Sequence, residues 1–287
     1  MEADLTRLPL KSILIRSTNW IGDAIMTTPA VHTIRSNFPD ARITMLAMPW
    51  VGDIFRLSPD VDEVIDYDKK VRHKGKVKGV LAVGKELREH QFDAVIYLQN
   101  AFEAAFIGSL AKIPVRAGFR RDGRGILLSH GVKIPAELRK KHQVYYYQYL
   151  CKALGMSLGP DRLHLPLPEK LKQWTETRLA TLIEKHGRST PDGNKVPVNP
   201  AEAERVPVIG FNPGAAYGPA KRWPAAKFSE LATMICERLG DSGCVILVFG
   251  TDADGKAAAE IADSSARCGH HVVDLTGKTS LEQVIGL

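Results

Sequence analysis

Short apolar runs alternate with stretches of helical periodicity along most of this chain, and this alternation constrains the fold more than any other feature. Runs of this length suit strands that are buried in a sheet, and strands that alternate with helices form a parallel sheet covered by helices. The sequence therefore predicts an α/β fold with doubly wound parallel sheets. The expected strands are 12–16, 43–47, 63–65, 93–98, 115–118, 208–211, 245–249 and 271–275.

The alternation is interrupted once, between residues 166 and 205. A polar helical stretch at 169–186 is followed there by a segment rich in proline, asparagine and charge. We therefore expect an N-terminal α/β domain over 1–165, a linker helix and polar loop over 166–205, and a C-terminal α/β domain over 206–287. Three strands are few for a doubly wound sheet, so the second domain is expected to be incomplete at its C-terminus.

Composition narrows the class of protein. No apolar run approaches the roughly 20 residues of a membrane span, and the first residues lack the apolar block of a secretory signal, so a cytoplasmic protein is expected. The formal net charge of +7 favours an anionic partner, which could be nucleic acid, a phosphorylated lipid surface or an acidic glycan. Aromatic and basic residues are not interleaved as on a nucleic-acid surface, so nucleic acid is disfavoured.

A loop of small residues at 210–224 joins an expected strand to an expected helix. Gly214 and Gly218 would let backbone amides approach a ligand closely, Lys221 and Arg222 bring positive charge, and the helix would aim its N-terminal amides the same way. Such a loop suits a diphosphate. The alternative is an ordinary turn with two solvated basic side chains.

Two segments far apart in the chain resemble one enzyme family. Residues 212–224 read Asn-Pro-Gly-Ala-Ala-Tyr-Gly-Pro-Ala-Lys-Arg-Trp-Pro, and residues 16–30 contain an Asn-Trp-Ile-Gly-Asp core. Both resemble loops of the ADP-heptose:lipopolysaccharide heptosyltransferases, glycosyltransferase family 9, and the second is most similar to the heptosyltransferase II branch. The likeness runs from about residue 10 to residue 287. It implies two facing Rossmann-like domains of GT-B type with the site in the cleft between them.

The resemblance also implies a reaction, which is the inverting transfer of heptose from ADP-L-glycero-D-manno-heptose to the first heptose of the lipopolysaccharide inner core. Such a reaction needs a base for the acceptor hydroxyl and a cation for the departing diphosphate. Asp23 and Lys221 are the candidates for these catalytic roles. For Asp23 the alternative is a plain helix N-cap, which is a common position for aspartate.

Binding residues are expected in loops that follow strands, because parallel sheets place ligands at the carboxyl ends of their strands. By resemblance, the acceptor is expected to meet Asn19, Trp20, Gly22, Arg120 and Arg121. The donor is expected to meet Asn212, Gly214, Ala215, Ala216, Arg222, Gly250, Asp252, Lys278 and Thr279.

Other motifs point to different chemistry. Residues 250–256 fit the spacing of a phosphate-binding P-loop, but Ala257 replaces the expected hydroxyl, and Asp252 and Asp254 would oppose a phosphate. A P-loop NTPase is therefore a remote alternative. The triplets 66–68 and 252–254 match the Asp-x-Asp metal pair of another glycosyltransferase fold, but such triplets are frequent by chance. No metal and no cofactor is expected.

The expected partners are a nucleotide-sugar donor and an acidic lipopolysaccharide core at the cytoplasmic face of the inner membrane. A basic segment at 69–78 would be drawn to such a surface, although it could also be a solvated loop. The family carries a later Asp-Ser/Thr-Gly-x-x-His signature that this sequence lacks. Another family 9 heptosyltransferase and an inactive truncated paralogue therefore remain as alternatives.

Overall fold

The computed structural model describes residues 4–187, 206–215, 218–240, 243–264 and 271–287. The chain divides into two compact units, Met1–Pro166 and Leu167–Leu287. The expected residue Ala216 lies outside the described residues, as does most of the polar loop that follows the helical stretch at 169–186.

The first unit is built on a six-stranded parallel sheet with the strand order β3-β2-β1-β4-β5-β6, which is the order of a doubly wound nucleotide-binding fold. Every residue of β4 is buried, as is all of β1 after its first residue, so these two strands form the centre of the core. The strands are β1 (Ser12–Arg16), β2 (Arg42–Ala47), β3 (Glu63–Asp66), β4 (Ala94–Tyr97), β5 (Val115–Phe119) and β6 (His130–Val132).

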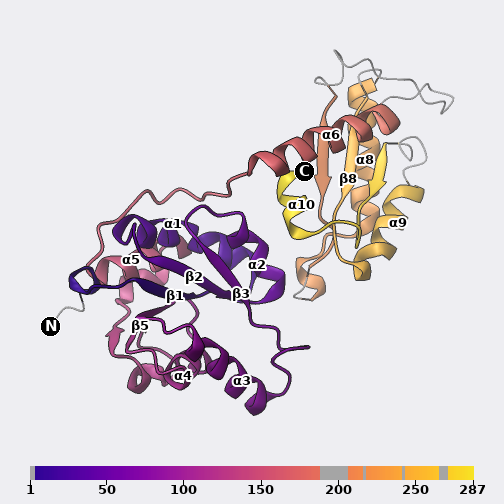
Figure 1. Ribbon diagram of the computed structural model, residues 1–287. Coiled ribbons are helices and arrows are strands. Elements are labelled where there is room, and N and C mark those ends of the chain that lie inside the picture. The colour runs from indigo at the N-terminus through magenta and orange to yellow at the C-terminus, as the bar shows by residue number, and fades with distance from the viewer. Residues whose placement is uncertain (1–3, 188–205, 216–217, 241–242, 265–270) are drawn as a thin grey trace. The chain divides into compact units, whose positions relative to one another are not determined.

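Helices cover both faces of this sheet. Figure 1 shows α1, α2 and α5 on one face and α3 and α4 on the other, and α1 packs against both α2 and α5. Short 3-10 turns occupy Leu5–Arg7, Arg124–Leu127 and Ala136–Lys140. The helices are α1 (Ile21–Asn37), α2 (Pro49–Arg56), α3 (Lys76–Glu89), α4 (Phe102–Leu110) and α5 (Gln143–Ala153).

The helix α1 continues without interruption through Pro29, which sequence reasoning treats as a point where a helix kinks or restarts. Proline cannot donate to the carbonyl four residues earlier, which belongs to Ile25. That carbonyl accepts a hydrogen bond from the Thr28 hydroxyl at 2.8 Å instead. The side chain thus satisfies the backbone group that the proline leaves without a helical partner.

The second unit holds a three-stranded parallel sheet in the order β7-β8-β9, between two helical layers. On one face, α6 contributes buried residues to a cluster with β8, and on the other, α8 and α9 pack against the sheet. The elements are β7 (Val208–Phe211), β8 (Val245–Val248), β9 (Val272–Asp274), α6 (Glu169–His186), α8 (Ala225–Leu239), α9 (Gly255–Ser264) and α10 (Leu281–Gly286), with 3-10 turns at Pro219–Lys221 and Asp252–Asp254.

The helix α6 is a structural part of this second unit, although the sequence suggests a linker there. Leu182 and Ile183 of α6 are buried against Val245 and Leu247 of β8. The helix looks polar along its length because only a narrow stripe of it faces the sheet. The division between the units accordingly lies between Pro166 and Leu167, before α6 begins.

Candidate active site

A buried arginine fixes the loop between β1 and α1. Arg16 is 2% exposed, and its guanidinium donates hydrogen bonds to the backbone oxygens of Ser17 at 2.5 Å and Leu46 at 3.2 Å. It also donates to the Asn19 side-chain oxygen at 2.9 Å, while the Trp50 ring nitrogen donates to the Asn19 backbone oxygen at 2.9 Å. Hydrogen bonds to one side chain and to two backbone oxygens of the loop therefore fix the loop that leads to Asp23.

No carboxylate among the described residues forms an ion pair with Arg16, and the guanidinium carbon lies 5.5 Å from the centre of the Tyr67 ring. Burial lowers the pKa of Arg16 to about 10, against the opposing effect of Tyr67 and Glu103, so the group stays charged at neutral pH. Sequence reasoning did not single out this residue. The available signal is a charge that ends the apolar run Ile13-Leu14-Ile15.

Asp23 is the third residue of α1, and the N-cap of that helix is Trp20. The N-cap role considered for Asp23 is therefore wrong. Its carboxylate is partly buried and forms neither a hydrogen bond nor an ion pair with the residues that the structure describes. The first turn of a helix favours a negative charge, and an added Cβ at the neighbouring Gly22 would meet no atom within 4 Å. Asp23 is thus an accessible, unpaired carboxylate.

A cavity of about 870 Å³ opens in the same unit, beside β5 and the start of α5. Four of its lining residues are cationic and none is anionic. They include both arginines expected to bind the acceptor. The cavity is lined by Asn100, Arg120, Arg121, Lys133, Ile134, Leu138, Lys141, Gln143 and Tyr146.

A second buried arginine shapes this cavity. Arg124 is fully buried, donates to the backbone oxygens of Phe119, at 2.9 Å, and Gln99, and reaches the Asn100 side-chain oxygen at 3.1 Å. The Asn100 amide in turn donates to the Tyr146 hydroxyl at 2.9 Å. Burial lowers the pKa of Arg124 to about 10, with nearby tyrosines opposing the shift. This network fixes one wall of the cavity and leaves Arg120 and Arg121 exposed at its rim.

Asp23 and the basic cavity are connected through α5. The Gln143 amide, which lines the cavity, donates to the Tyr147 hydroxyl at 3.4 Å. The pKa of Tyr147 rises to about 12, mainly because the ring is buried, and the negative charge of Asp23 contributes to the rise. Tyr147 therefore feels the charge of Asp23 and accepts a hydrogen bond from Gln143, a residue that lines the cavity.

In the second unit, the loop after β7 is closed by Arg222. Its guanidinium donates twice to the Ala215 backbone oxygen, at 3.2 and 3.0 Å. Lys221 ends a 3-10 turn on this loop and is exposed, and α8 begins at Ala225. Trp223 packs edge-on against Phe228 with ring centres 5.0 Å apart. Arg222 thus holds the loop, and Lys221 is a second cation on the same loop, with an exposed side chain.

The loop after β8 meets the first one through a carboxylate. Asp254 accepts hydrogen bonds from the backbone nitrogen of Thr251 at 2.9 Å and from its hydroxyl at 2.8 Å. A Cβ added at Gly214 would stand 2.6 Å from this carboxylate, so glycine is required where the loops touch. In a P-loop the backbone nitrogens of the loop donate hydrogen bonds to a phosphate, but here the Thr251 nitrogen donates to the Asp254 carboxylate instead. The structure therefore supports rejecting the P-loop interpretation.

The loop after β9 completes this edge of the sheet. The Gly277 nitrogen donates to the Gly250 oxygen at 3.0 Å, and a Cβ at Gly277 would stand 1.7 Å from an Asp252 carboxylate oxygen. Lys278 forms an ion pair with Asp274 at 2.9 Å. Burial favours a higher pKa for Asp274, but hydrogen bonds from Thr276 and Lys278 outweigh it and lower the pKa.

Three of the expected donor-binding side chains therefore have structural partners. Asp252 packs against Gly277, Lys278 pairs with Asp274, and Arg222 bonds to Ala215. Asn212 is exposed and Thr279 is half-buried at the same edge. Within the described ranges, no group of three histidine, cysteine or acidic side chains could hold a metal ion, and no described helix is long and apolar enough to cross a membrane.

Two parallel α/β units with loops gathered at the carboxyl ends of their strands are the architecture of a GT-B glycosyltransferase, and comparison with known proteins agrees. A solved structure of E. coli ADP-heptose lps heptosyltransferase II matches with a TM-score of 0.73 and 27% identity, over 96% of this chain and 76% of the other. The class is therefore an enzyme that transfers a sugar from an activated donor.

The family follows from the sequence comparisons. The family model described as glycosyltransferase family 9 (heptosyltransferase) matches residues 80–287. Lipopolysaccharide heptosyltransferase 2 of Escherichia coli K12 is 30% identical over 95% of this chain and 73% of its own length. Lipooligosaccharide heptosyltransferase 2 of Haemophilus ducreyi is 28% identical over 96% and 74%. The chain belongs to glycosyltransferase family 9, the heptosyltransferases.

Replacing Arg16 with lysine should destabilise the first unit by roughly 1–3 kcal/mol, because the three hydrogen bonds come from two guanidinium nitrogens and the single nitrogen of lysine cannot occupy both positions. Urea unfolding measures the loss. The matched control is Arg56→Lys, since Arg56 is partly exposed and forms ion pairs with Asp53 and Asp66. That change should cost less than about 1 kcal/mol. Equal losses for the two variants would show that Arg16 does not fix the loop.

Proposed function

We propose that this chain transfers heptose from ADP-L-glycero-D-manno-heptose to the first heptose of a lipopolysaccharide inner core, with inversion at the anomeric carbon. The observations that carry the proposal are the unpaired Asp23 carboxylate in the first turn of α1 and, in the same unit, a cavity with cationic and no anionic lining side chains. The family membership and the name of the E. coli relative, which specifies ADP-heptose, support the donor.

In the proposed mechanism, Asp23 accepts the proton of the acceptor hydroxyl as the hydroxyl oxygen bonds to the anomeric carbon. The bond from that carbon to the diphosphate oxygen breaks, and ADP leaves with the electron pair. Lys221 stabilises the charge that grows on the diphosphate, assisted by the N-terminal amides of α8, which begins four residues later. Arg222 acts indirectly by holding the loop closed.

The remaining donor contacts are proposed for the loops after β8 and β9. Asp252 and the backbone of Gly250 present oxygens at this edge, and such groups suit hydroxyls of a ribose. Asn212 and Thr279 offer further polar groups from the loops after β7 and β9. Gly214 and Ala215 would contribute backbone groups beside the diphosphate.

The basic cavity is the proposed acceptor site. Nascent lipopolysaccharide carries phosphates and sugar carboxylates, and such anions bind arginine through paired, charge-assisted hydrogen bonds. Arg120 and Arg121 lie exposed at the rim. Gly22 leaves space beside the base, and Asn19 and Trp20 shape the approach to it. The position of the acceptor hydroxyl distinguishes this activity from that of another family 9 heptosyltransferase.

The alternative of an inactive form is tested directly by activity. Purified protein, ADP-heptose and an acceptor that ends in a single heptose should give a product larger by one heptose, detected by mass spectrometry. An acceptor that lacks heptose should not react. Reaction with the second acceptor alone would assign the chain to a different family 9 heptosyltransferase, and no reaction with either would support an inactive form.

Asp23→Asn should lower kcat by about 10²–10⁴, the usual contribution of a positioned base, with little change in either KM. Lys221→Ala should lower kcat by a comparable factor. ADP release, followed by a coupled assay, measures both. Glu169→Gln is the matched control, because Glu169 also lies in the first turn of a helix and should leave kcat unchanged. A fully active Asp23→Asn enzyme would rule out the proposed base.

Replacing Arg120 and Arg121 together with glutamine should raise KM for the acceptor by about ten- to a hundredfold and leave KM for ADP-heptose within about twofold, since hydrogen bonds to charged groups contribute ~1.5–3 kcal/mol. The control is the double change of Arg7 and Arg42 to glutamine, because both are exposed and lie outside the cavity. An unchanged acceptor KM in the first variant would place the acceptor elsewhere.

We further propose that transfer requires no metal, because cations and helix amides are positioned to stabilise the diphosphate without one. Turnover in the presence of EDTA should equal turnover without it. Loss of turnover that returns on addition of a divalent cation would contradict this proposal. We also propose that the enzyme works in the cytoplasm, at the periphery of the inner membrane, where its acceptor is anchored.

A further inference from the structure

We propose that one surface of the first unit docks on an anionic lipid bilayer. This lipid-docking surface consists of the exposed apolar side chains of α3 and α4 together with the basic segment 69–78. The choice of a membrane as partner rests on the proposed lipid-borne acceptor. The docking itself can be measured without any transfer reaction.

The apolar part of the surface is an exposed group of four large side chains. Phe102 and Phe106 of α4 are 44% and 38% exposed, and their rings stack with centres 6.2 Å apart. Val77 and Leu81 of α3 are 71% and 49% exposed. A groove of about 190 Å³ runs between the two helices, lined by Val77, Val80, Phe102 and Phe106 together with Lys76 and Glu103.

These side chains are not part of the protein core. On α3, Val80, Val83 and Leu87 face inward, and Gly84 allows a close approach to Leu110 near the end of α4. Val77 and Leu81 are four residues apart on the outward side of α3, and Phe102 and Phe106 have the same spacing on α4. Two helices thus present a joint apolar stripe to solvent, and contiguous exposed apolar patches mark interaction sites.

Positive charge surrounds the stripe. Lys70, Lys74, Lys76 and Lys78 are exposed and form no ion pair with the described residues. Two of the nearby carboxylates are paired with cations, and a third, Asp68, accepts hydrogen bonds from backbone nitrogens. Glu103 pairs with Lys69 at 2.6 Å, and Glu86 pairs with Arg72 at 2.9 Å and contacts His73 at 3.0 Å. The four lysines therefore give this surface an uncompensated positive charge.

The basic segment is held in a defined conformation. The backbone nitrogen of His73 donates to the Asp68 oxygen at 2.7 Å, and the Asp68 carboxylate accepts from the nitrogens of Lys70 and Val71. The His73 side chain is 2% exposed, and a Cβ at Gly79 would overlap the His73 backbone oxygen. The lysines are thus presented from a fixed turn beside the apolar stripe.

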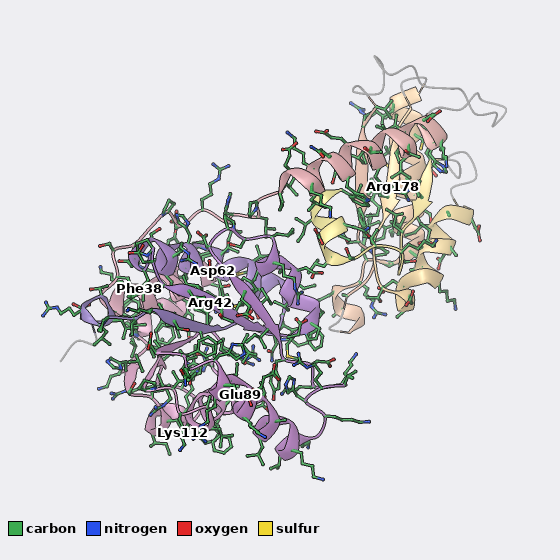
Figure 2. The ribbon with its side chains drawn as sticks, in the orientation of Figure 1. Phe38, Arg42, Asp62, Glu89, Lys112 and Arg178 are labelled. Atoms are coloured by element: carbon green, nitrogen blue, oxygen red, sulfur yellow. The ribbon has the colours of Figure 1, made fainter. Side chains whose placement is uncertain are left out.

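A bilayer fits this combination better than a nucleic acid or a protein. Aromatic and aliphatic side chains can enter the boundary between headgroups and acyl chains, while lysine ammonium groups reach lipid phosphates around them. The cations are lysines, which act as point charges on flexible stems and suit diffuse anionic headgroups. Figure 2 helps to locate the two helices, because it labels Glu89, the last residue of α3, and Lys112, which follows α4.

The lipid-docking surface is close to the proposed acceptor site within the first unit. The helices α3 and α4 begin at the carboxyl edge of the sheet, because each follows a parallel strand. Asn100 lines the basic cavity and Phe102 begins α4 only two residues later. A docked bilayer would therefore bring an anchored acceptor to the cavity, so docking would affect reactions of membrane-bound acceptors specifically.

The test is sedimentation of the full chain with vesicles of phosphatidylcholine alone or mixed with phosphatidylglycerol. Binding should require phosphatidylglycerol and weaken as salt is raised. Replacing Phe102 and Phe106 with serine, or Lys70, Lys74, Lys76 and Lys78 with glutamine, should each weaken binding at least about tenfold. Thermal unfolding checks that both variants are folded.

Matched controls change equally exposed residues elsewhere. They are Leu158 and Leu163 to serine, and Lys152, Lys170, Lys172 and Lys185 to glutamine. Both should bind like the unchanged chain. Unchanged binding by either docking variant overturns the proposal, as does equal loss in the controls. So does a change in oligomeric state caused by the serine variant, measured by sedimentation velocity, because a second copy would then cover the stripe.

A water-soluble acceptor without acyl chains separates docking from catalysis. Folded docking variants should transfer heptose to it at the rate of the unchanged chain. If the unchanged chain binds vesicles as expected but transfers no heptose, the proposed function fails and the lipid-docking surface stands. If it transfers heptose but does not bind anionic vesicles, the docking proposal fails and the function stands.

Discussion

The first unit depends on two buried guanidinium groups that bond to main-chain carbonyls instead of carboxylates. Arg16 joins the end of β1 to the neighbouring β2 and to Asn19, and Arg124 joins the loops after β4 and β5. A buried charge is costly unless it is hydrogen-bonded, and carbonyl oxygens accept from both amino groups of Arg16 and from Arg124, although the Arg16 Nε has no partner among the described residues. These arginines have no ion pair with Asp23, which is unpaired among the described residues.

Carboxylates also hold loops in the second unit. The loops after β8 and β9 are each held by a carboxylate of their own, since Asp254 accepts from the Thr251 amide and hydroxyl, and Asp274 accepts from Thr276 and Lys278. Glycine at position 214 provides the space that the Asp254 carboxylate fills, and glycine at position 277 provides the space for Asp252. Guanidinium groups thus hold the loops of the first unit, whereas the second unit uses the Arg222 guanidinium in the loop after β7 and carboxylates in the loops after β8 and β9.

The sequence predicts the strands of both sheets well, because buried parallel strands are continuous apolar runs. It misses β6, since His130-Gly131-Val132 contains no such run, and it treats α6 as a linker because only a narrow stripe of α6 is buried. The loops of the candidate site follow from strand ends and from family resemblance. The roles of Arg16, Arg124 and Asp254 do not, because they depend on contacts between segments that are distant in sequence or on the folded shape of a turn. The contact of Asp252 with Gly277 and the ion pair of Lys278 with Asp274 cannot be read from the sequence either.

The carboxylates of the β8 loop also make the charge uneven along this edge of the second sheet, with negative charge at the β8 loop and positive charge at the end of the β7 loop. A nucleoside diphosphate laid across the edge would be repelled by Asp254 and Asp252 and attracted toward the end of the β7 loop, where Lys221 and the first amides of α8 lie. Its uncharged hydroxyls suffer no such repulsion and could donate to the same aspartates. One orientation of the nucleotide would therefore be favoured before any contact with the transferred sugar. An inorganic phosphate would be repelled by the Asp252 and Asp254 carboxylates in the loop at 250–256, although the spacing of that loop fits a P-loop.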